Sequence, residues 1–281
     1  MKARTLIKTF SGIDTADGDG VKLTRIIGSP QLNMLDPFLL LDCFASDQAQ
    51  DYIGGFPEHP HRGFETVTYL LNGKMRHKDN AGNEGIIEPG GVQWMTAGRG
   101  ILHSEMPEQE DGLLQGFQLW VNLPRSAKMT APRYQEYAPD TIAVEHLAGG
   151  GSIKVIAGKT DLGTIGPVIN DYVFPTYMDI SLPAGSSFSQ TITHGHNAFI
   201  YLLEGEIVIS ADNEQQTLPA KNLGILSDGE QVSVTAGEQD SRFLLIAGKP
   251  LNEPVARGGP FVMNTEAEIQ QAFVDYQRGL F

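Results

Sequence analysis

Two histidines, at positions 59 and 61, are the first residues in the sequence that suggest chemistry. They open the stretch HPHRGFETVTYLLNG, which continues into an apolar run. Residues at positions i and i+2 of a β-strand point to the same face. His59 and His61 would therefore project together, with Pro60 opposite, where proline suits an edge strand or a strand start. The pair either binds a metal ion or lies by chance at the mouth of a strand.

A second pair with the same spacing, His103 and Glu105, lies in the stretch GRGILHSEMP. Two strands that face each other inside a barrel would bring three imidazoles and one carboxylate to one point. This ligand set suits Fe(II), Mn(II), Ni(II), Cu(II) or Zn(II), and Fe(II) is the usual choice where open coordination positions serve oxygen chemistry. A single His-x-His pair is a weak signal, but the second pair makes a metal site the better interpretation.

An internal repeat indicates two copies of one β domain. The sequence TYLLNGKM at 68–75 recurs as IYLLEGEI at 200–207, and the two copies are separated by close to half of the 281-residue chain. Two domains are also the usual arrangement at this length. The 32 glycines and 16 prolines, together with short Val, Ile, Thr and Tyr runs, favour a turn-rich β architecture. We expect an N-terminal domain at 1–130 and a C-terminal domain at 131–281.

One helix is expected, at about 265–278. Thr265 suits the N-cap position, and Glu268 follows at the spacing of a capping box. Ile269, Phe273 and Tyr276 recur at helical spacing and would form one apolar face. A helix packed over a sheet is the simplest interpretation of this segment, and a helix that binds a partner is the alternative.

Composition and charge exclude several classes of function. The chain carries 20 Lys and Arg against 34 Asp and Glu, and its net charge of -14 would repel a nucleic-acid backbone. No apolar stretch approaches the roughly 20 residues of a membrane span, and the N-terminal residues lack the apolar core of a signal peptide. The single cysteine, Cys43, excludes an internal disulfide and lies in an apolar setting. We expect a cytoplasmic protein that binds neither membranes nor nucleic acid directly.

Several stretches resemble the pirin family, the two-domain branch of the cupin superfamily. They are HPHRGFETVTYLLNGKMRHKD at 59–79, PGGVQWMTAGRGILHSEMP at 89–107, LDPFLLLD at 35–42 and GPFVMNT at 259–265. The resemblance is dense in the first half, thinner between about 125 and 195, and clear again near the end. It implies an all-β fold with a cupin-type β-barrel or jelly roll in each half and a short C-terminal helix.

The resemblance also implies a site and an activity. His59, His61, His103 and Glu105 would hold one mononuclear iron in the N-terminal domain, with Mn, Ni, Cu, Co or Zn as alternatives to Fe(II). The implied activity is that of a quercetin 2,3-dioxygenase, in which a small aromatic substrate, a flavonol, is cleaved by O2 with loss of carbon monoxide. Glu105 would act as a fixed ligand or as the base that ionises the substrate.

Other functions are compatible with the same ligands. Pirin-like proteins are also associated with the binding of regulatory protein partners, in which case the metal would act as a redox-dependent switch without turnover. A metal-assisted isomerase or lyase would need no oxygen. An enzyme needs a metal site that a substrate can reach, whereas a switch can be closed.

Glu65 is ambiguous at this stage. The general cupin pattern would place a carboxylate ligand at Glu65 and a histidine near Trp94, whereas the pirin pattern uses Glu105. Glu65 is therefore expected to orient another group or to lie in a turn, with the roles of metal ligand or surface acid as alternatives.

The second copy also contains two histidines, His194 and His196. A constant shift equal to the separation of the two motif copies places neither of them at a ligand position. That shift maps the four ligands and Glu65 to Thr191, Thr193, Thr235, Gly237 and Asn197. We therefore expect a C-terminal domain without a metal site.

The remaining polar and aromatic residues near the motifs receive structural interpretations. His77 is expected in a solvated turn. Trp94 and Trp120 are expected in the core, with cavity lining as an alternative for Trp94. Arg62 and Arg99 are expected at the surface or in turns, with a clamp for an anionic substrate as the alternative.

Overall fold

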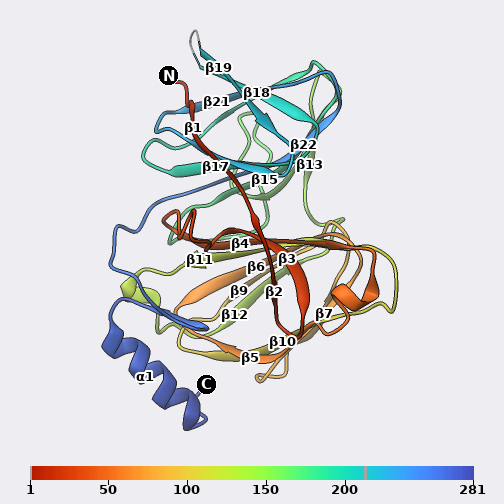
Figure 1. Ribbon diagram of the computed structural model, residues 1–281. Coiled ribbons are helices and arrows are strands. Elements are labelled where there is room, and N and C mark those ends of the chain that lie inside the picture. Colours follow the sequence, from red (N-terminus) through yellow and green to blue (C-terminus); the bar gives the residue numbers. More distant parts are fainter. Residues whose placement is uncertain (1, 212–213) are drawn as a thin grey trace. The chain divides into compact units, whose positions relative to one another are not determined.

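The computed structural model, which describes residues 2–211 and 214–281, shows two compact β units, each built around two large antiparallel sheets (Figure 1). We call them the N-terminal barrel and the C-terminal barrel. The N-terminal barrel comprises Ile13–Met34, Phe38–Pro139 and Leu251–Phe281. The C-terminal barrel comprises the described residues up to Gly12, Leu35–Pro37 and Asp140–Pro250.

The two units exchange their ends. The described residues up to Gly12 belong to the C-terminal barrel, because β1 pairs with β20 and extends that sheet. The segment Leu251–Phe281 belongs to the N-terminal barrel, and so does β12, which lies beyond the predicted boundary at 130 and pairs with β9. A single boundary between residues 130 and 131 therefore differs from the observed division. Sequence pattern alone does not say which sheet edge an end strand will cover.

The N-terminal barrel contains a seven-stranded sheet in the order β12-β9-β6-β11-β4-β3-β2, a four-stranded sheet in the order β5-β10-β7-β8 and the two-stranded sheet β23-β24. Its elements are β2 (Ile13–Asp17), β3 (Val21–Ile27), β4 (Phe38–Ser46), β5 (Phe56–His61), β6 (Phe64–Asn72), β7 (Met75–Asp79), β8 (Glu84–Ile87), β9 (Val92–Thr96), β10 (Ile101–Pro107), β11 (Leu114–Asn122), β12 (Arg133–Tyr137), β23 (Ala256–Gly258), β24 (Phe261–Met263) and α1 (Glu266–Gln277).

The C-terminal barrel repeats this plan, with sheet orders β1-β20-β17-β22-β15-β14-β13 and β16-β21-β18-β19. Its elements are β1 (Leu6–Ser11), β13 (Val144–His146), β14 (Ser152–Ala157), β15 (Thr176–Leu182), β16 (Ser187–Thr191), β17 (Asn197–Glu204), β18 (Glu206–Ala211), β19 (Glu214–Pro219), β20 (Asn222–Leu226), β21 (Gln231–Ala236) and β22 (Ser241–Gly248). The two copies of the YLL motif lie in β6 and β17, at the same place in the two sheets, so the predicted repeat is confirmed.

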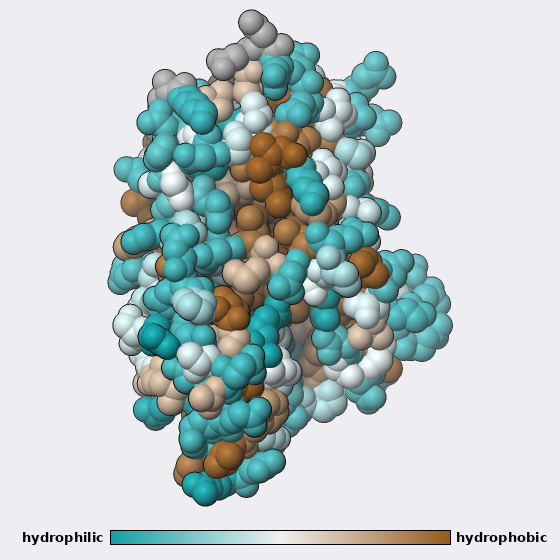
Figure 2. Space-filling view, turned by 60° about the vertical axis from the view of Figure 1, so that its left-hand side comes forward, coloured by the Kyte–Doolittle hydropathy of each residue, from teal (hydrophilic) through white to brown (hydrophobic). Residues whose placement is uncertain are grey.

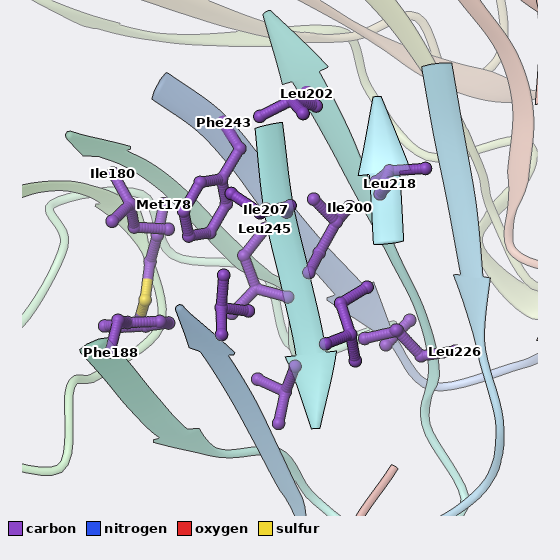
Figure 3. Close-up of a cluster of buried hydrophobic side chains, with 14 of the residues drawn as sticks. Met178, Ile180, Phe188, Ile200, Leu202, Ile207, Leu218, Leu226, Phe243 and Leu245 are labelled. Atoms are coloured by element: carbon purple, nitrogen blue, oxygen red, sulfur yellow. The ribbon is translucent and has the colours of Figure 1, made fainter. Parts of the chain in front are cut away.

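The interior of the C-terminal barrel is apolar. Figure 3 shows side chains from both sheets converging on one cluster, among them Phe188 and Leu245. Alternate residues of β17, Ile200 and Leu202, point into this cluster, as the two-residue period of a strand requires. Burial of these side chains away from water is what stabilises this sheet pair.

The C-terminal helix forms at the predicted place. The Thr265 hydroxyl accepts a hydrogen bond from the backbone N–H of Glu268 (3.3 Å), and the Glu268 carboxylate accepts one from the backbone N–H of Thr265 (2.8 Å). This reciprocal pair is the predicted capping box. Ile269 is buried, and the rings of Phe273 and Tyr276 lie against Phe261 of β24. The helix thus packs on the N-terminal barrel.

The face drawn in Figure 2 is mostly hydrophilic; its largest group of hydrophobic residues lies in the upper half of the view, and smaller ones are scattered over the rest. The helices of the described residues include none that is long and apolar enough to cross a membrane. The predicted all-β architecture with a short C-terminal helix is confirmed.

Candidate metal centre

The two predicted histidine strands are neighbours in the four-stranded sheet of the N-terminal barrel. β5 and β10 pair in antiparallel fashion, with His59 directly opposite His103 and His61 opposite Ile101. Residues that pair directly across two strands point to the same face. The three imidazoles therefore lie on one side of the sheet, and they offer ring nitrogens within 4.8 Å of one another.

The geometry of the first histidine pair suits a shared ion. His59 Nδ1 lies 2.8 Å from the carbonyl oxygen of Pro57, and this contact fixes the proton on Nδ1 and leaves the Nε2 lone pair free. The Nε2 atoms of His59 and His61 are 3.0 Å apart. Two nitrogens bound at right angles to one ion at about 2.1 Å would be separated by about 3.0 Å. The pair is thus spaced for coordination of one ion.

His103 provides the strongest sign that these imidazoles are built for a ligand. It is 1% exposed, and neither of its ring nitrogens has a hydrogen-bond partner among the residues that the structure describes. A buried imidazole without partners is destabilising, and a metal ion would occupy one of the two nitrogens. Burial, and after it the neighbouring histidines, lowers the pKa of both His61 and His103 well below the ordinary value. The rings are therefore neutral, which is the form that binds metals.

Glu105 lies beside the imidazoles in the same cavity. It is 3% exposed, and its Oε1 atom lies 2.7 Å from the hydroxyl of Thr68. That hydroxyl also lies 2.7 Å from the side-chain amide of Gln118. A hydroxyl has one proton, so it donates to Glu105 if Gln118 presents its amide nitrogen. Glu105 does not belong to the group of atoms within 4.8 Å, but its carboxylate lines the cavity with His59 and His61.

Strand parity resolves the ambiguity of Glu65. Thr68 of β6 points into the barrel toward Glu105, and β6 is regular between residues 65 and 68. Glu65 is three positions away and therefore points to the opposite face of the sheet. It is fully buried there and accepts a hydrogen bond from the hydroxyl of Thr96 (2.7 Å). Glu65 is thus neither a surface acid nor a neighbour of the three imidazoles.

The cavity has a volume of about 560 Å³, within the range of small-molecule sites. Three parts of the N-terminal barrel form it: the inner face of the seven-stranded sheet, β5 with β10, and the segment after residue 250. The residues that line the cavity include Arg25, Leu40, Asp42, Phe44, His59, His61, Glu105, Gln118, Trp120 and Arg257. Trp120 is a cavity residue, whereas Trp94 pairs with Val67 and so shares the opposite face with Glu65.

Two family models of known proteins match parts of this chain. Residues 20–121 match the family model described as Pirin, and residues 177–281 match the one described as Pirin C-terminal cupin domain. A pirin-like protein of Caulobacter vibrioides is 53% identical over the full length of both chains. The chain belongs to the pirin family.

Solved structures give the same result for the fold of this pirin-family chain. The crystal structure of a quercetin 2,3-dioxygenase from Acinetobacter baumannii is 36% identical, with a TM-score of 0.89, and the match covers 99% of this chain and 98% of that one. A bacterial pirin of Escherichia coli, solved with nickel(II), is 20% identical, with a TM-score of 0.66 over 86% of this chain and 99% of that one. The predicted cupin-type fold with two domains is thereby confirmed.

The C-terminal barrel of this pirin-family chain presents other residues where the N-terminal barrel has the candidate ligands. Strand pairing, aligned on the repeated motif, defines the equivalent positions. His59, His61, His103 and Glu105 correspond to Gln190, Ile192, Val232 and Val234. The constant shift taken from the motif copies was therefore wrong for these strands, because the turns between the strands differ in length.

The histidines of the second copy lie apart from that interior. His194 is 69% exposed and pairs with Asp228 at 3.1 Å, whereas His196 is buried directly before β17. Among the residues that the structure describes, the group of three close ligand side chains in the N-terminal barrel has no counterpart in the C-terminal barrel.

His77 contradicts its predicted place in a solvated turn. It lies in β7, directly opposite Glu105, and is 2% exposed. Its Nε2 atom is 2.5 Å from a carboxylate oxygen of Glu136, and its ring stacks on Tyr134. The hydrogen bond from His77 lowers the pKa of Glu136. The strand alternation in MRHKD places His77 on the same buried face as Met75 and Asp79. The prediction was wrong because it put the end of the strand before His77, whereas the strand continues to Asp79.

Arg62 also differs from its prediction as a surface residue. It is 3% exposed, and its guanidinium bonds the carboxylate of Asp275 in α1 at 2.7 Å and the carbonyl oxygen of Arg99 at 2.5 Å. Its charge is therefore used to fasten the C-terminal helix, not to clamp an anionic substrate. Arg99 is exposed, as predicted.

Proposed function

We propose that this protein is a metal-dependent dioxygenase of the pirin type that cleaves a flavonol such as quercetin with O2. In this proposal His59, His61, His103 and Glu105 hold one Fe(II). The observation that carries the proposal is the group of three close imidazoles, two of which, His59 and His61, line a cavity large enough for a flavonol together with the carboxylate of Glu105. The resemblance to a solved quercetin 2,3-dioxygenase at 36% identity supports it.

Different residues of the cavity would bind the metal ion, accept a proton and pack against the substrate. The iron would supply a Lewis-acidic, redox-active centre next to the substrate. Glu105 is positioned by Thr68 through one carboxylate oxygen, so its other oxygen would bind the iron or, in the alternative role, accept the proton of a substrate hydroxyl. Leu40, Phe44 and Trp120 line the same cavity and provide apolar surface for an aromatic ring while they exclude water.

The cavity favours an enzyme over a closed regulatory switch. His59 and His61 line its wall, so a small molecule that enters it reaches the imidazoles directly. A redox-sensitive partner-binding function stays a prediction from the sequence, and so does a cytoplasmic location.

The test is oxygen consumption by protein that has been reconstituted with Fe(II) under anaerobic conditions. On addition of O2 and quercetin, we expect loss of the flavonol absorbance, uptake of one O2 and release of one carbon monoxide per flavonol. A His61→Ala variant should do none of these. If the iron-loaded protein leaves quercetin unchanged in a buffer where an authentic dioxygenase works, the proposal fails.

A further inference from the structure

The wall of the cavity contains a guanidinium that the predicted chemistry does not use. Arg257 of β23 lines the cavity. Its Nη1 atom donates to the carbonyl oxygen of Leu39 at 3.1 Å and makes a longer contact with that of Asn33 at 3.5 Å. These carbonyl contacts hold the side chain in place.

The charge of Arg257 is not balanced by a carboxylate, unlike that of its neighbour Arg25. Arg25 bonds both carboxylate oxygens of Asp42 (2.9 and 2.7 Å) and also pairs with Asp17 at 2.8 Å. Within residues 2–211 and 214–281, Arg257 has no ion pair. Burial, with the charge of Arg25 nearby, lowers the pKa of Arg257, although a guanidinium remains charged. Among the described residues, Arg257 is therefore a guanidinium at the cavity wall without a carboxylate partner of its own, while the carboxylates of Asp17, Asp42 and Glu105 line other parts of the wall.

The free side of this guanidinium has the shape of a carboxylate receptor. Nη1 is engaged by the carbonyls, and no described residue accepts a hydrogen bond from Nε or Nη2. The N–H groups of Nε and Nη2 point the same way and form the planar fork that matches the two oxygens of a carboxylate. A fixed guanidinium in a cavity wall, with this fork not engaged by any described residue, is suited to bind an anionic group of a ligand.

Trp120 connects this charge to the candidate metal centre. Its ring lies 5.9 Å from the guanidinium carbon of Arg257 and 5.2 Å from the ring of His61. Both groups are thus next to the same indole. An aromatic molecule that packs on Trp120 can face the imidazoles with one end and the guanidinium with the other.

We infer that Arg257 determines substrate specificity and that the cavity selects an aromatic substrate with a carboxylate at the end remote from the metal-binding hydroxyl groups. This inference rests on the proposed metal site and deepens the proposed function. Quercetin has no carboxylate, so it would occupy the cavity without using Arg257. Among flavonol-like substrates, the cavity would then prefer one that carries such a carboxylate over uncharged quercetin.

Binding of a matched acid and amide tests this inference. The probes are 3,4-dihydroxybenzoate and 3,4-dihydroxybenzamide, which share their shape and catechol group but differ in charge. Their affinities would be measured by calorimetry under nitrogen with the iron-loaded protein and again with the metal-free protein. We expect the acid to bind about tenfold to hundredfold more tightly than the amide, as for a charge-assisted pair of hydrogen bonds.

Variants assign the preference to Arg257. Arg257→Gln should remove the difference between acid and amide, and Arg257→Lys should keep part of it. Arg278→Gln is the control, because Arg278 is an exposed cation of the same C-terminal segment that does not line the cavity. It should keep the full preference. Circular dichroism would verify that each variant is folded.

Two results would overturn the inference: equal binding of acid and amide by the unaltered protein, or an acid preference that survives in Arg257→Gln. Failure of the proposed function gives a different result. In that case oxygen uptake is absent while the acid preference and its dependence on Arg257 remain, because the binding measurement involves no turnover.

Discussion

The two barrels have equivalent strand orders, but at equivalent inward-facing positions one has polar side chains and the other has apolar ones. In the N-terminal barrel, Thr68, Gln118 and Asp42 occupy successive paired positions across β6, β11 and β4. The equivalent positions in β17, β22 and β15 hold Ile200, Leu245 and Met178. In the polar set, Gln118 and Asp42 line a cavity and Thr68 bonds Glu105 at its wall, whereas the apolar set fills the barrel.

This difference shows that the alternation along the strands determines the fold, while the residues chosen for the inner face determine whether there is a site. Apolar inner residues stabilise the sheet pair by burial alone. Polar inner residues need hydrogen-bond partners, as Thr68 and Glu105 provide for each other. The ring nitrogens of His103 have no such partner among the described residues. The N-terminal barrel thus gives up stability at the place where a ligand can bind.

The largest effect is expected from removal of one imidazole. His103→Ala should weaken metal binding by roughly a hundredfold or more, because the ion loses a ligand from a fixed set. His196→Ala, in the other barrel, is the matched control and should bind metal as the unaltered protein does. Elemental analysis after equilibrium dialysis measures both. Equal metal content in the two variants would contradict the assignment of the site to the N-terminal barrel.

The converse change places a ligand-type residue in the apolar barrel. Val234→Glu introduces a carboxylate at the position equivalent to Glu105, without a partner such as Thr68. We expect the free energy of unfolding to fall by about 3 kcal/mol or more in urea titrations. Thr235→Glu, on the opposite face of the same strand, should cost about 1 kcal/mol or less. Similar losses in both variants would show that the inner face is not the deciding feature.

A smaller effect is expected at the residue that holds Glu105. Thr68→Val keeps the shape of the side chain and removes the hydroxyl bonded to Glu105 Oε1. Metal affinity should fall by about tenfold, as for other groups that orient a ligand. Thr66→Val changes the next inward-facing threonine of β6, which has no bond to Glu105, and serves as the control. Competition with a fluorescent chelator measures the affinities, and an unchanged value for Thr68→Val would contradict this role of the hydroxyl.

The smallest effect is the pH dependence of the metal-free protein. Burial lowers the pKa of His61 and His103 in the fold, whereas in the unfolded chain these residues titrate near 6.5. The unfolded state therefore binds more protons below about pH 6.5. As the pH decreases below this value, the free energy of unfolding falls by up to about 1.4 kcal/mol per histidine for each pH unit. His103→Gln should reduce this slope between pH 6.5 and 5. Urea titrations at several pH values measure it, and a flat profile in the unaltered protein would contradict the burial of neutral imidazoles.

The sequence was sufficient for those features that depend on local spacing. The capping box of Thr265 and Glu268 follows from the helical period, and the common face of His59 and His61 follows from the strand period; the structure contains both. The direct pairing of β5 with β10 in one sheet does not follow from spacing, which had suggested two strands on facing sides of a barrel. Local spacing did not reveal Arg257 as a cavity residue, because it lies in a segment far along the chain from His103. Nor did it reveal the register of β21, because a change of turn length shifts every later residue.

The most direct test of the central claim is anomalous X-ray diffraction from crystals of the iron-loaded protein. The account predicts one iron peak in the N-terminal barrel, about 2.0–2.2 Å from a ring nitrogen of each of His59, His61 and His103 and from an oxygen of Glu105. A peak in the C-terminal barrel, or one bound by fewer than three of these imidazoles, would contradict it.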